Sequence, residues 1–356
     1  MRRFNPDMLA IARDASGFTQ GELVEALGGA ISQGSLSKIE NGLLEPSKED
    51  VSSLAKALGF RPEFFLHGHV RRAAPPTYNR SRKKLSAKDW SRIFATSEIY
   101  RVSASLLLRS VELAPKLPPA PSIDPDQHGG RVEDIAVAMR QFWRLPRGPI
   151  EDVTSLIVSA GIIVVTYDFG TDLCDGFGQL PADDMPPMIF INSRQPKDRF
   201  RFTLCHELGH IIMHSLPRPT MEDEANRFAA EFLMPTADIM KDFYNMSLEK
   251  LMALKMHWRA SMHSIVYKAR SCGKMTESTY NYYMVTMSKK GWKTKEPIEL
   301  KNVRETPRLI SQLVRSHLGA LQYSVDDLAA LTGLLPPKFE ELHGLDHKPR
   351  LRLVVG

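Results

Sequence analysis

The sequence predicts a multidomain protein with an all-α amino-terminal domain, a central α+β domain and a helical carboxy-terminal region. Three observations predict this organisation. Two short helix patterns joined by a glycine-containing turn lie within the first 45 residues. His206 and His210 lie four residues apart in an apolar stretch that follows two strand-like segments. Between these regions, residues 117–125 are rich in proline and read as a stiff linker.

The composition is that of a protein with room for two or three domains, since the chain has 356 residues. A net charge of +6 and a pI of about 9.1 permit contact with nucleic acid without requiring it. Three cysteines give no disulfide framework. No apolar run reaches the roughly 18 residues of a membrane span, and we find no secretory signal. We therefore expect a cytoplasmic protein with reduced thiols and no membrane partner.

The first helix pattern begins at Thr19, the expected N-cap, and Glu22 three residues later completes a capping box. Gly28 ends this helix because glycine adopts the left-handed conformation of a helix end. Ser32 caps the next helix, which Gly42 ends. Two short helices joined by a tight turn form a helix-turn-helix arrangement.

The pattern over residues 5–68 resembles the phage-repressor-like (XRE/Cro) DNA-binding domains. The resemblance implies a double-stranded DNA operator as partner. By this resemblance two glutamines meet phosphates or base edges and three further side chains lie in the major groove: Gln20 and Gln33, then Ser35, Ser37 and Lys38. A palindromic operator would require a homodimer, for which the helix expected over residues 85–111 is a candidate interface.

The charge of this region argues against DNA binding at first sight. Residues 1–70 hold seven Lys and Arg against nine Asp and Glu, a net charge of −2. DNA affinity depends strongly on neutralising phosphates, so an acidic domain is not an obvious DNA binder. However, residues 71–84 hold six Arg and Lys and no acid. This stretch is either a solvated hinge or a basic arm along the DNA backbone, and we expect DNA binding.

The rest of the chain divides at the proline-rich linker. Residues 85–111 have a helical pattern that we expect to bridge domains or to dimerise. Residues 324–333 resemble the helix that begins at Thr19, but Pro336 and Pro337 follow, so we expect no second DNA-reading helix there. We predict four parts of the chain. They are a helix-turn-helix domain (residues 5–68), a hinge with helix and linker (69–125), a metal-binding domain (126–272) and a helical accessory region (273–356).

The segment His206-Glu207-Leu208-Gly209-His210 is an H-E-x-x-H motif. On a helix, residues four apart share one face, so both imidazoles can reach a single metal ion. Glu207 lies about 100° further round the helix, beside the metal, where it can act as a general base towards water. The pattern therefore predicts hydrolytic metal chemistry.

A zinc site of this kind needs a third ligand, which is usually a carboxylate. Residues 221–235 form a second helix pattern that Pro235 closes. Glu224 lies at the edge of the apolar stripe of this helix, where a carboxylate is costly unless it is paired or binds a metal. Glu222 fits better as a solvated acidic residue at a helix start. We favour Glu224 over Glu222 as the ligand.

Residues 199–214 together with 222–235 resemble the ImmA/IrrE family of zinc metallo-endopeptidases, and the likeness extends over residues 148–269. The resemblance implies a gluzincin-like α+β fold. In it His206, His210 and Glu224 hold Zn2+ and Glu207 is catalytic. We expect strands over residues 161–168 and 188–192, and a strand edge that binds an extended peptide.

Two functions from different classes follow from these patterns. The first is a DNA-binding transcriptional regulator whose zinc-dependent endopeptidase cleaves a repressor or another regulatory protein. The alternative is a transcriptional repressor or antitoxin-like protein whose zinc domain is a sensor that does not catalyse a reaction. Loss of proteolysis in a Glu207→Gln variant separates the two.

Overall fold

The computed structural model describes residues 3–72, 85–182, 184–292, 295–300 and 305–345. Four of the six basic residues between positions 71 and 84 lie outside the described residues, so the predicted hinge or basic arm is not described further. The chain forms two compact units. The first unit comprises Met1–Ala74, Lys84–Leu113 and Arg308–Gly356, and the second comprises Pro75–Lys83 and Ala114–Pro307. In the described part of the chain, no helix combines the length and hydropathy needed to cross a membrane.

The amino-terminal part of the first unit is a group of short helices: α1 (Pro6–Ala15), α2 (Gln20–Ala26), α3 (Gln33–Glu40), α4 (Lys48–Leu58) and the 3-10 helix η1 (Pro62–Leu66). Thr19 caps α2 and exchanges hydrogen bonds with Glu22, as a capping box requires. Ser32 caps α3 through the backbone N–H of Ser35. The helix starts predicted from the sequence are therefore confirmed.

Helix α5 (Ala87–Leu107) crosses the first unit and packs against α1. It is buried on nearly every side, so that even Glu98 and Arg101 are almost inaccessible. Glu98 contacts His69 at 2.6 Å between a carboxylate oxygen and Nε2. The helix that the sequence suggested as a bridge or a dimer interface is thus a central element of the first unit.

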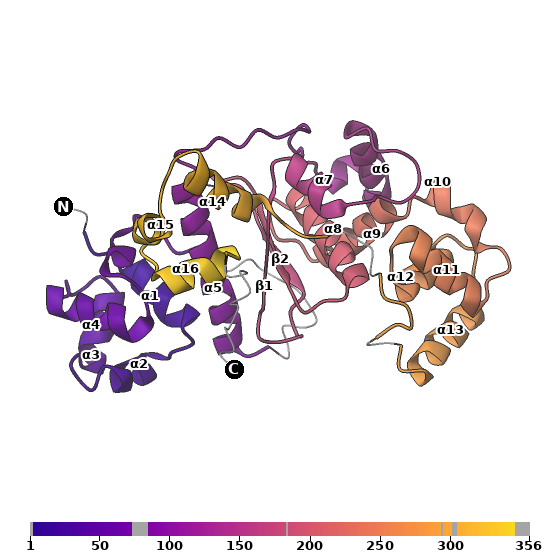
Figure 1. Cartoon of the computed structure of the whole chain (residues 1–356). Helices are drawn as coiled ribbons and strands as arrows, with labels where there is room; N and C mark the ends of the chain where they lie inside the picture. Colours follow the sequence, from indigo (N-terminus) through magenta and orange to yellow (C-terminus); the bar gives the residue numbers. More distant parts are fainter. Residues whose placement is uncertain (1–2, 73–84, 183, 293–294, 301–304, 346–356) are drawn as a thin grey trace, which may run out of the picture. The chain divides into compact units, whose positions relative to one another are not determined.

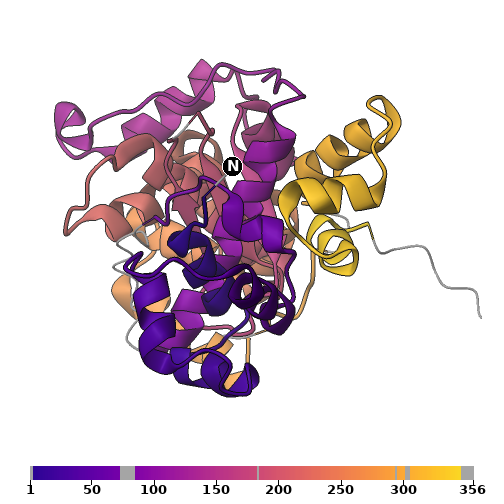
Figure 2. The same ribbon diagram turned by 90° about the vertical axis from the view of Figure 1, so that its left-hand side faces the viewer.

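Three carboxy-terminal helices complete the first unit: α14 (Leu309–Gly319), α15 (Val325–Thr332) and α16 (Pro336–His343). Figure 2 shows them beside α5, and they share one hydrophobic core with the amino-terminal helices. Residues 275–300 belong to the second unit, so the predicted accessory region is divided between the two units. Contrary to the reasoning from the sequence, Pro336 and Pro337 do not prevent a helix after α15, whereas the expectation that this region holds no second DNA-reading helix stays a prediction. The two prolines occupy the first positions of α16, where a proline lacks no hydrogen bond.

The second unit contains a small sheet of three strands: β1 (Ile163–Tyr167), β2 (Gly176–Gln179) and β3 (Met188–Asn192). Their order is β1-β3-β2, with β1 parallel and β2 antiparallel to β3. β1 and β3 lie within the segments predicted as strands. β2 was not predicted, since its four residues include two glycines and carry no apolar alternation.

Helices surround this sheet: α6 (Val132–Phe142), α7 (Val153–Ser159), α8 (Lys197–Met213), α9 (Met221–Leu233), α10 (Thr236–Ile239), α11 (Leu248–Trp258), α12 (Met262–Ser271) and α13 (Glu277–Lys289), with the 3-10 helices η3 (Pro125–His128) and η4 (Met240–Phe243). A helical first unit and a second unit with a small mixed sheet and many helices confirm the predicted fold class.

Helices α8 and α9 pack closely, and α8 also covers β2 and β3 (Figure 1). Gly209 permits the close approach of the two helices. A Cβ atom at this position would lie 3.1 Å from Cδ1 and 3.3 Å from Cγ of the Phe228 ring. Core packing therefore explains the glycine inside the H-E-x-x-H motif and holds the faces of α8 and α9 together.

A carboxylate from the segment after α13 reaches a buried cation in the first half of α8. Glu305 pairs with Arg201 of α8, and neither side chain is exposed. Glu305 also accepts hydrogen bonds from the backbone N–H groups of Val153 and Thr154 at the start of α7. The chain that leaves the second unit is therefore attached to the helix that carries the histidines.

Candidate metal centre

The two histidines of the H-E-x-x-H motif point towards one another from successive turns of α8. The Nε2 atoms of His206 and His210 are 3.0 Å apart. The carboxylate of Glu222, in the first turn of α9, lies 3.6 Å from each of them, one oxygen to each imidazole. Together these residues form a three-ligand cluster whose ligand atoms lie within 4.8 Å of one another.

Asn226 fixes the orientation of His206. Its side-chain oxygen lies 3.0 Å from Nδ1 of His206. Because an amide oxygen only accepts, Nδ1 carries the hydrogen and Nε2 keeps its lone pair. A neutral imidazole with this tautomer is the form that binds a metal through Nε2.

His210 is fixed by a chain of two hydrogen bonds. Nε2 of His214 lies 2.9 Å from a carboxylate oxygen of Glu224, and Nδ1 of His214 lies 2.9 Å from Nδ1 of His210. The carboxylate accepts the hydrogen of Nε2, so Nδ1 of neutral His214 accepts the hydrogen of His210. Nε2 of His210 therefore also keeps its lone pair, and it faces Glu222.

These residues fit a zinc ion. Zinc binds histidine nitrogen at about 2.0–2.1 Å in tetrahedral sites, which places neighbouring ligand atoms about 3.3 Å apart. The observed separations of 3.0, 3.6 and 3.6 Å bracket that value. Two lone-pair nitrogens and a carboxylate that converge in this way form the donor set of a zinc site with one position left open.

The structure places Glu224 differently from the sequence prediction. Its carboxylate faces His214, and it also accepts a hydrogen bond from Oγ1 of Thr220 at 2.8 Å. Nη2 of Arg218 lies 3.3 Å from Oε1 of Glu224, the carboxylate oxygen that does not face His214. A buried carboxylate must be paired or bound to a metal, and here it is paired. The geometry therefore favours Glu222, the residue that the sequence analysis set aside, as the third ligand.

The sequence analysis named neither Asn226 nor His214 as a residue of the site. Asn226 is four residues after Glu222 and therefore lies on the same face of α9, so the ligand and the orienting residue share one helical spacing. His214 stands in the same relation to His210 on α8. The burial pattern of α9 shows which residues face inward but not which partner each one meets.

Glu207 lies beside this cluster and is 5 % exposed. Burial raises the pKa of its carboxyl to about 7, although the nearby His206 opposes the shift. The backbone N–H of Gly178 in β2 donates a hydrogen bond to it. A carboxyl group with a pKa near neutrality can both accept and return a proton.

β2 is one of the two edge strands of the sheet and packs against α8, the helix that carries Glu207. A Cβ atom on Gly178 would lie 3.5 Å from Oε2 of Glu207, so the strand lies directly against the carboxylate. An edge strand presents backbone groups to which an extended peptide can pair. The edge strand beside Glu207 is thus β2, which was not foreseen, and the binding of an extended peptide there stays a prediction.

Two family models match the chain. A helix-turn-helix model matches residues 9–65, and a peptidase model described as the IrrE N-terminal-like domain matches residues 159–270. The chain joins an XRE-type helix-turn-helix domain to an ImmA/IrrE-like domain. No curated protein matches the sequence.

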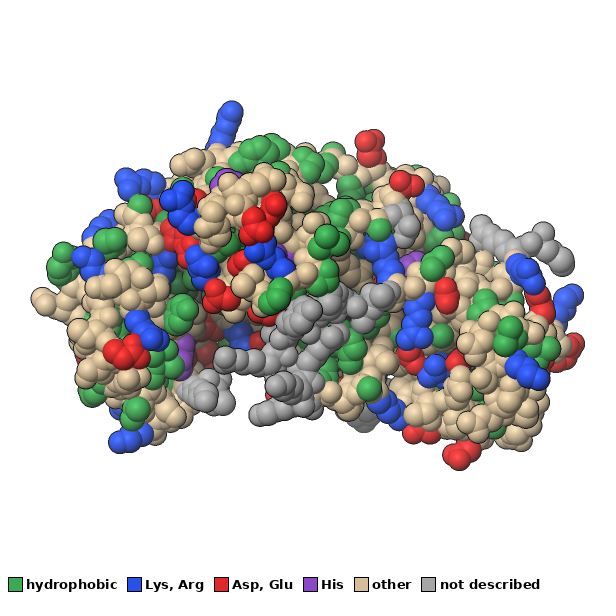
Figure 3. All heavy atoms as spheres, turned by 180° about the vertical axis from the view of Figure 1, so that it is seen from behind, with side chains coloured by type: hydrophobic (Ala, Val, Ile, Leu, Met, Phe, Trp, Pro, Cys, Tyr) green, Lys and Arg blue, Asp and Glu red, His purple; other side chains and the backbone are tan. Residues whose placement is uncertain are grey.

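The helix-turn-helix domain presents the predicted DNA-binding residues in different ways. Gln33 and Lys38 of α3 are exposed, and Ser35 and Ser37 are half-buried. Gln20 instead donates a hydrogen bond of 2.6 Å from Nε2 to the carboxylate of Glu40. Figure 3 shows basic and acidic side chains interspersed on one face of the molecule, so the described residues on that face form no continuous basic patch.

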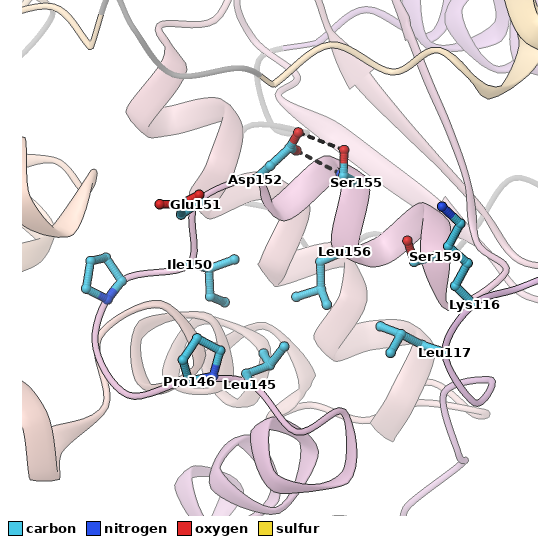
Figure 4. A pocket seen from close by; sticks show the side chains of 11 residues that line it. Lys116, Leu117, Leu145, Pro146, Ile150, Glu151, Asp152, Ser155, Leu156 and Ser159 are labelled. Atoms are coloured by element: carbon cyan, nitrogen blue, oxygen red, sulfur yellow. Dashed lines mark hydrogen bonds between the residues drawn. The ribbon is translucent and has the colours of Figure 1, made fainter.

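A cavity of about 460 Å³ lies elsewhere in the second unit, between α7, the loop that joins α6 to α7 and the chain that precedes α6. Leu117, Leu145 and Leu156 give it a largely apolar lining (Figure 4). Asp152 at its rim caps α7, because its carboxylate accepts hydrogen bonds from the backbone N–H and the hydroxyl of Ser155. None of its lining residues belongs to the histidine cluster, so the cavity is separate from the candidate metal centre.

Proposed function

We propose that the protein is a cytoplasmic, DNA-binding transcriptional regulator whose IrrE-like domain is a zinc-dependent endopeptidase. Its substrate is a repressor or another regulatory protein. The observation that carries the proposal is the pair of Nε2 lone pairs that face one carboxylate, held there by Asn226 and His214. The buried carboxyl of Glu207 beside them supports a hydrolytic reaction rather than a purely structural site.

The residues of the site have different roles in the proposed peptide hydrolysis. His206, His210 and Glu222 would hold a zinc ion, which would supply Lewis acidity towards water and towards the carbonyl of a substrate. Glu207 accepts a proton at its carboxylate and returns it to the leaving amine. The edge of β2 holds the backbone of an extended peptide, which leaves sequence selectivity to the pockets for its side chains.

The test is a Glu207→Gln variant compared with the wild type. We expect it to bind zinc and DNA as the wild type does but to generate no new protein amino termini in a cell lysate, mapped by mass spectrometry. Asp223→Asn is the matched control, because that carboxylate on α9 is 67 % exposed and faces away from the cluster. Equal cleavage by the wild type and Glu207→Gln would refute the mechanism.

The same experiment addresses the alternative function. If neither the wild type nor any variant produces new termini, while His206→Ala changes the affinity for DNA, the domain is a zinc sensor. The outcome depends on turnover and not on the presence of the metal, because both functions require zinc binding.

A further inference from the structure

The helix-turn-helix domain ends in a segment that recurs near the end of the chain. Residues 51–65 (the amino-terminal copy) align without a gap with residues 325–339 (the carboxy-terminal copy). Six of the fifteen aligned positions are identical: Val51 and Val325, Leu54 and Leu328, Ala55 and Ala329, Gly59 and Gly333, Pro62 and Pro336, Phe65 and Phe339.

The two copies also fold alike. In each, a helix ends at the glycine in a left-handed conformation, with φ of 72° at Gly59 and 71° at Gly333. In each, a second helix begins at the aligned proline, η1 in the amino-terminal copy and α16 in the carboxy-terminal copy. The aligned leucines and phenylalanines are fully buried in both copies. The repeat is therefore structural as well as sequential.

The copies pair with one another through equivalent residues. Phe60 and Leu334 form an antiparallel β-bridge, and they occupy the same position in the alignment. The backbone N–H of Arg61 donates to the carbonyl oxygen of Gly333 at 2.9 Å. When two similar segments meet antiparallel at an equivalent position, an approximate two-fold axis relates their backbones at that bridge; the relation is local, because a Cβ atom on Gly59 would meet nothing within 4 Å whereas one on Gly333 would meet Phe64. A two-fold relation is the arrangement of an interface between identical subunits.

The contact between the copies is close. A Cβ atom on Gly333 would lie 2.4 Å from Cα of Phe64, so only glycine fits there. The ammonium of Lys338 lies 3.5 Å from the centroid of the Phe60 ring. Arg61 pairs with Asp326 and donates to the carbonyl oxygen of Leu334 at 3.1 Å. Apolar, ionic and backbone contacts therefore all join the two copies.

We propose that the edge of the helix-turn-helix domain around Phe60 is a homotypic docking surface that this chain fills with its own carboxy-terminal copy. Its alternative occupant is the amino-terminal copy of a second chain. With the carboxy-terminal copy in place, this edge cannot join two proteins. When that copy is displaced, two chains pair about the same axis, and Phe60 of one then faces Phe60 of the other.

The first test displaces the carboxy-terminal copy in the full-length protein. Gly333→Val introduces a side chain where Phe64 leaves no space, and Gly344→Val is the matched control. Gly344 has a similar φ of 66°, but a Cβ atom there meets nothing within 4 Å. Both variants carry the same backbone strain. We expect the mass measured by sedimentation to double for Gly333→Val and to stay unchanged for Gly344→Val.

A cysteine at position 60 reports on this edge specifically. Non-hydrogen-bonded antiparallel pairs have Cα atoms about 4.5 Å apart, which suits a disulfide. Phe60→Cys combined with Gly333→Val should therefore give a covalent dimer on a non-reducing gel, whereas Phe60→Cys with Gly344→Val should not. Gly333→Val alone shows that the native cysteines do not form the link.

The proposal is overturned if Gly333→Val keeps its helical content by circular dichroism, remains monomeric and gives no link through position 60. Leu334→Glu provides an independent variant if the valine variant loses helix, because it places a charge at a fully buried contact. A dimer that forms without a link through position 60 also overturns the proposal, since another surface then joins the chains.

Discussion

Replacing Glu222 and Glu224 one at a time separates a metal ligand from a residue that positions one. Glu222→Ala removes a carboxylate that lies 3.6 Å from both Nε2 atoms. Glu224→Ala leaves those three groups in place but removes the acceptor of His214. We therefore expect zinc binding to weaken in both variants, and more severely in Glu222→Ala.

The size of the smaller effect follows from the hydrogen-bond chain. A hydrogen bond to a charged group contributes about 1.5–3 kcal/mol. Its loss lets His214 exchange tautomers, so that Nδ1 of His210 is no longer held as the donor. Residues that hold a metal ligand in place through hydrogen bonds contribute about 10–100-fold to metal affinity, or about 1.4–2.7 kcal/mol. Glu222→Ala should exceed the upper end of that range because a direct ligand is lost.

The assay is competition for zinc against a chromophoric chelator, with all proteins at one pH. Asp223→Ala is the control, since it lies between the two glutamates on α9 with a side chain that is 67 % exposed. It should bind zinc as the wild type does. If Glu224→Ala weakens binding as much as Glu222→Ala or more, Glu224 is the ligand and the assignment made from the geometry is refuted.

Three further predictions concern stability and DNA binding. Glu305→Ala should lower the free energy of unfolding by about 3–5 kcal/mol, because Arg201 stays buried without its partner; thermal melting should show no such loss for the exposed Glu299→Ala. Burial lowers the pKa of His343 to about 4 against about 6.5 when unfolded, so its contribution is complete above pH 6.5 and falls by about 3 kcal/mol towards pH 4. Urea unfolding at both pH values should show this loss in the wild type, and an equal loss in His343→Gln would contradict it. Lys38→Ala should lower the salt dependence of duplex-DNA binding by about one phosphate contact, and an unchanged slope would place Lys38 away from the phosphates.

Features set by neighbouring residues were predictable from the sequence. The capping box at Thr19 and the start of α3 at Ser32 depend on side chains within three residues of the backbone they bind. The spacing of His206 and His210 likewise determines a shared helix face. These predictions needed no knowledge of the tertiary fold, and the structure bears out the helix starts.

Features that depend on distant partners were not predictable. The choice between Glu222 and Glu224 depends on the rotation of α9 against α8, and the apolar stripe leaves both glutamates near its border. Glu305 contacts Arg201 across 104 positions of sequence, and nothing local marks either residue as buried. Pro336 was expected to break a helix, because a proline inside a helix does so. It stands instead at the first position of α16, where proline is favoured.

The first unit takes its helices from both ends of the chain, and this order has a consequence during synthesis. About 200 residues of the second unit separate α5 from α14, and a ribosome adds about 5–20 residues each second. For roughly 10–40 s each new chain therefore carries α1–α5 without the helices that complete their core. Phe60 and Phe64, which are buried in the finished protein, are without their final cover during that interval. On a crowded polysome, neighbouring nascent chains would meet at the very stage when this apolar edge is open.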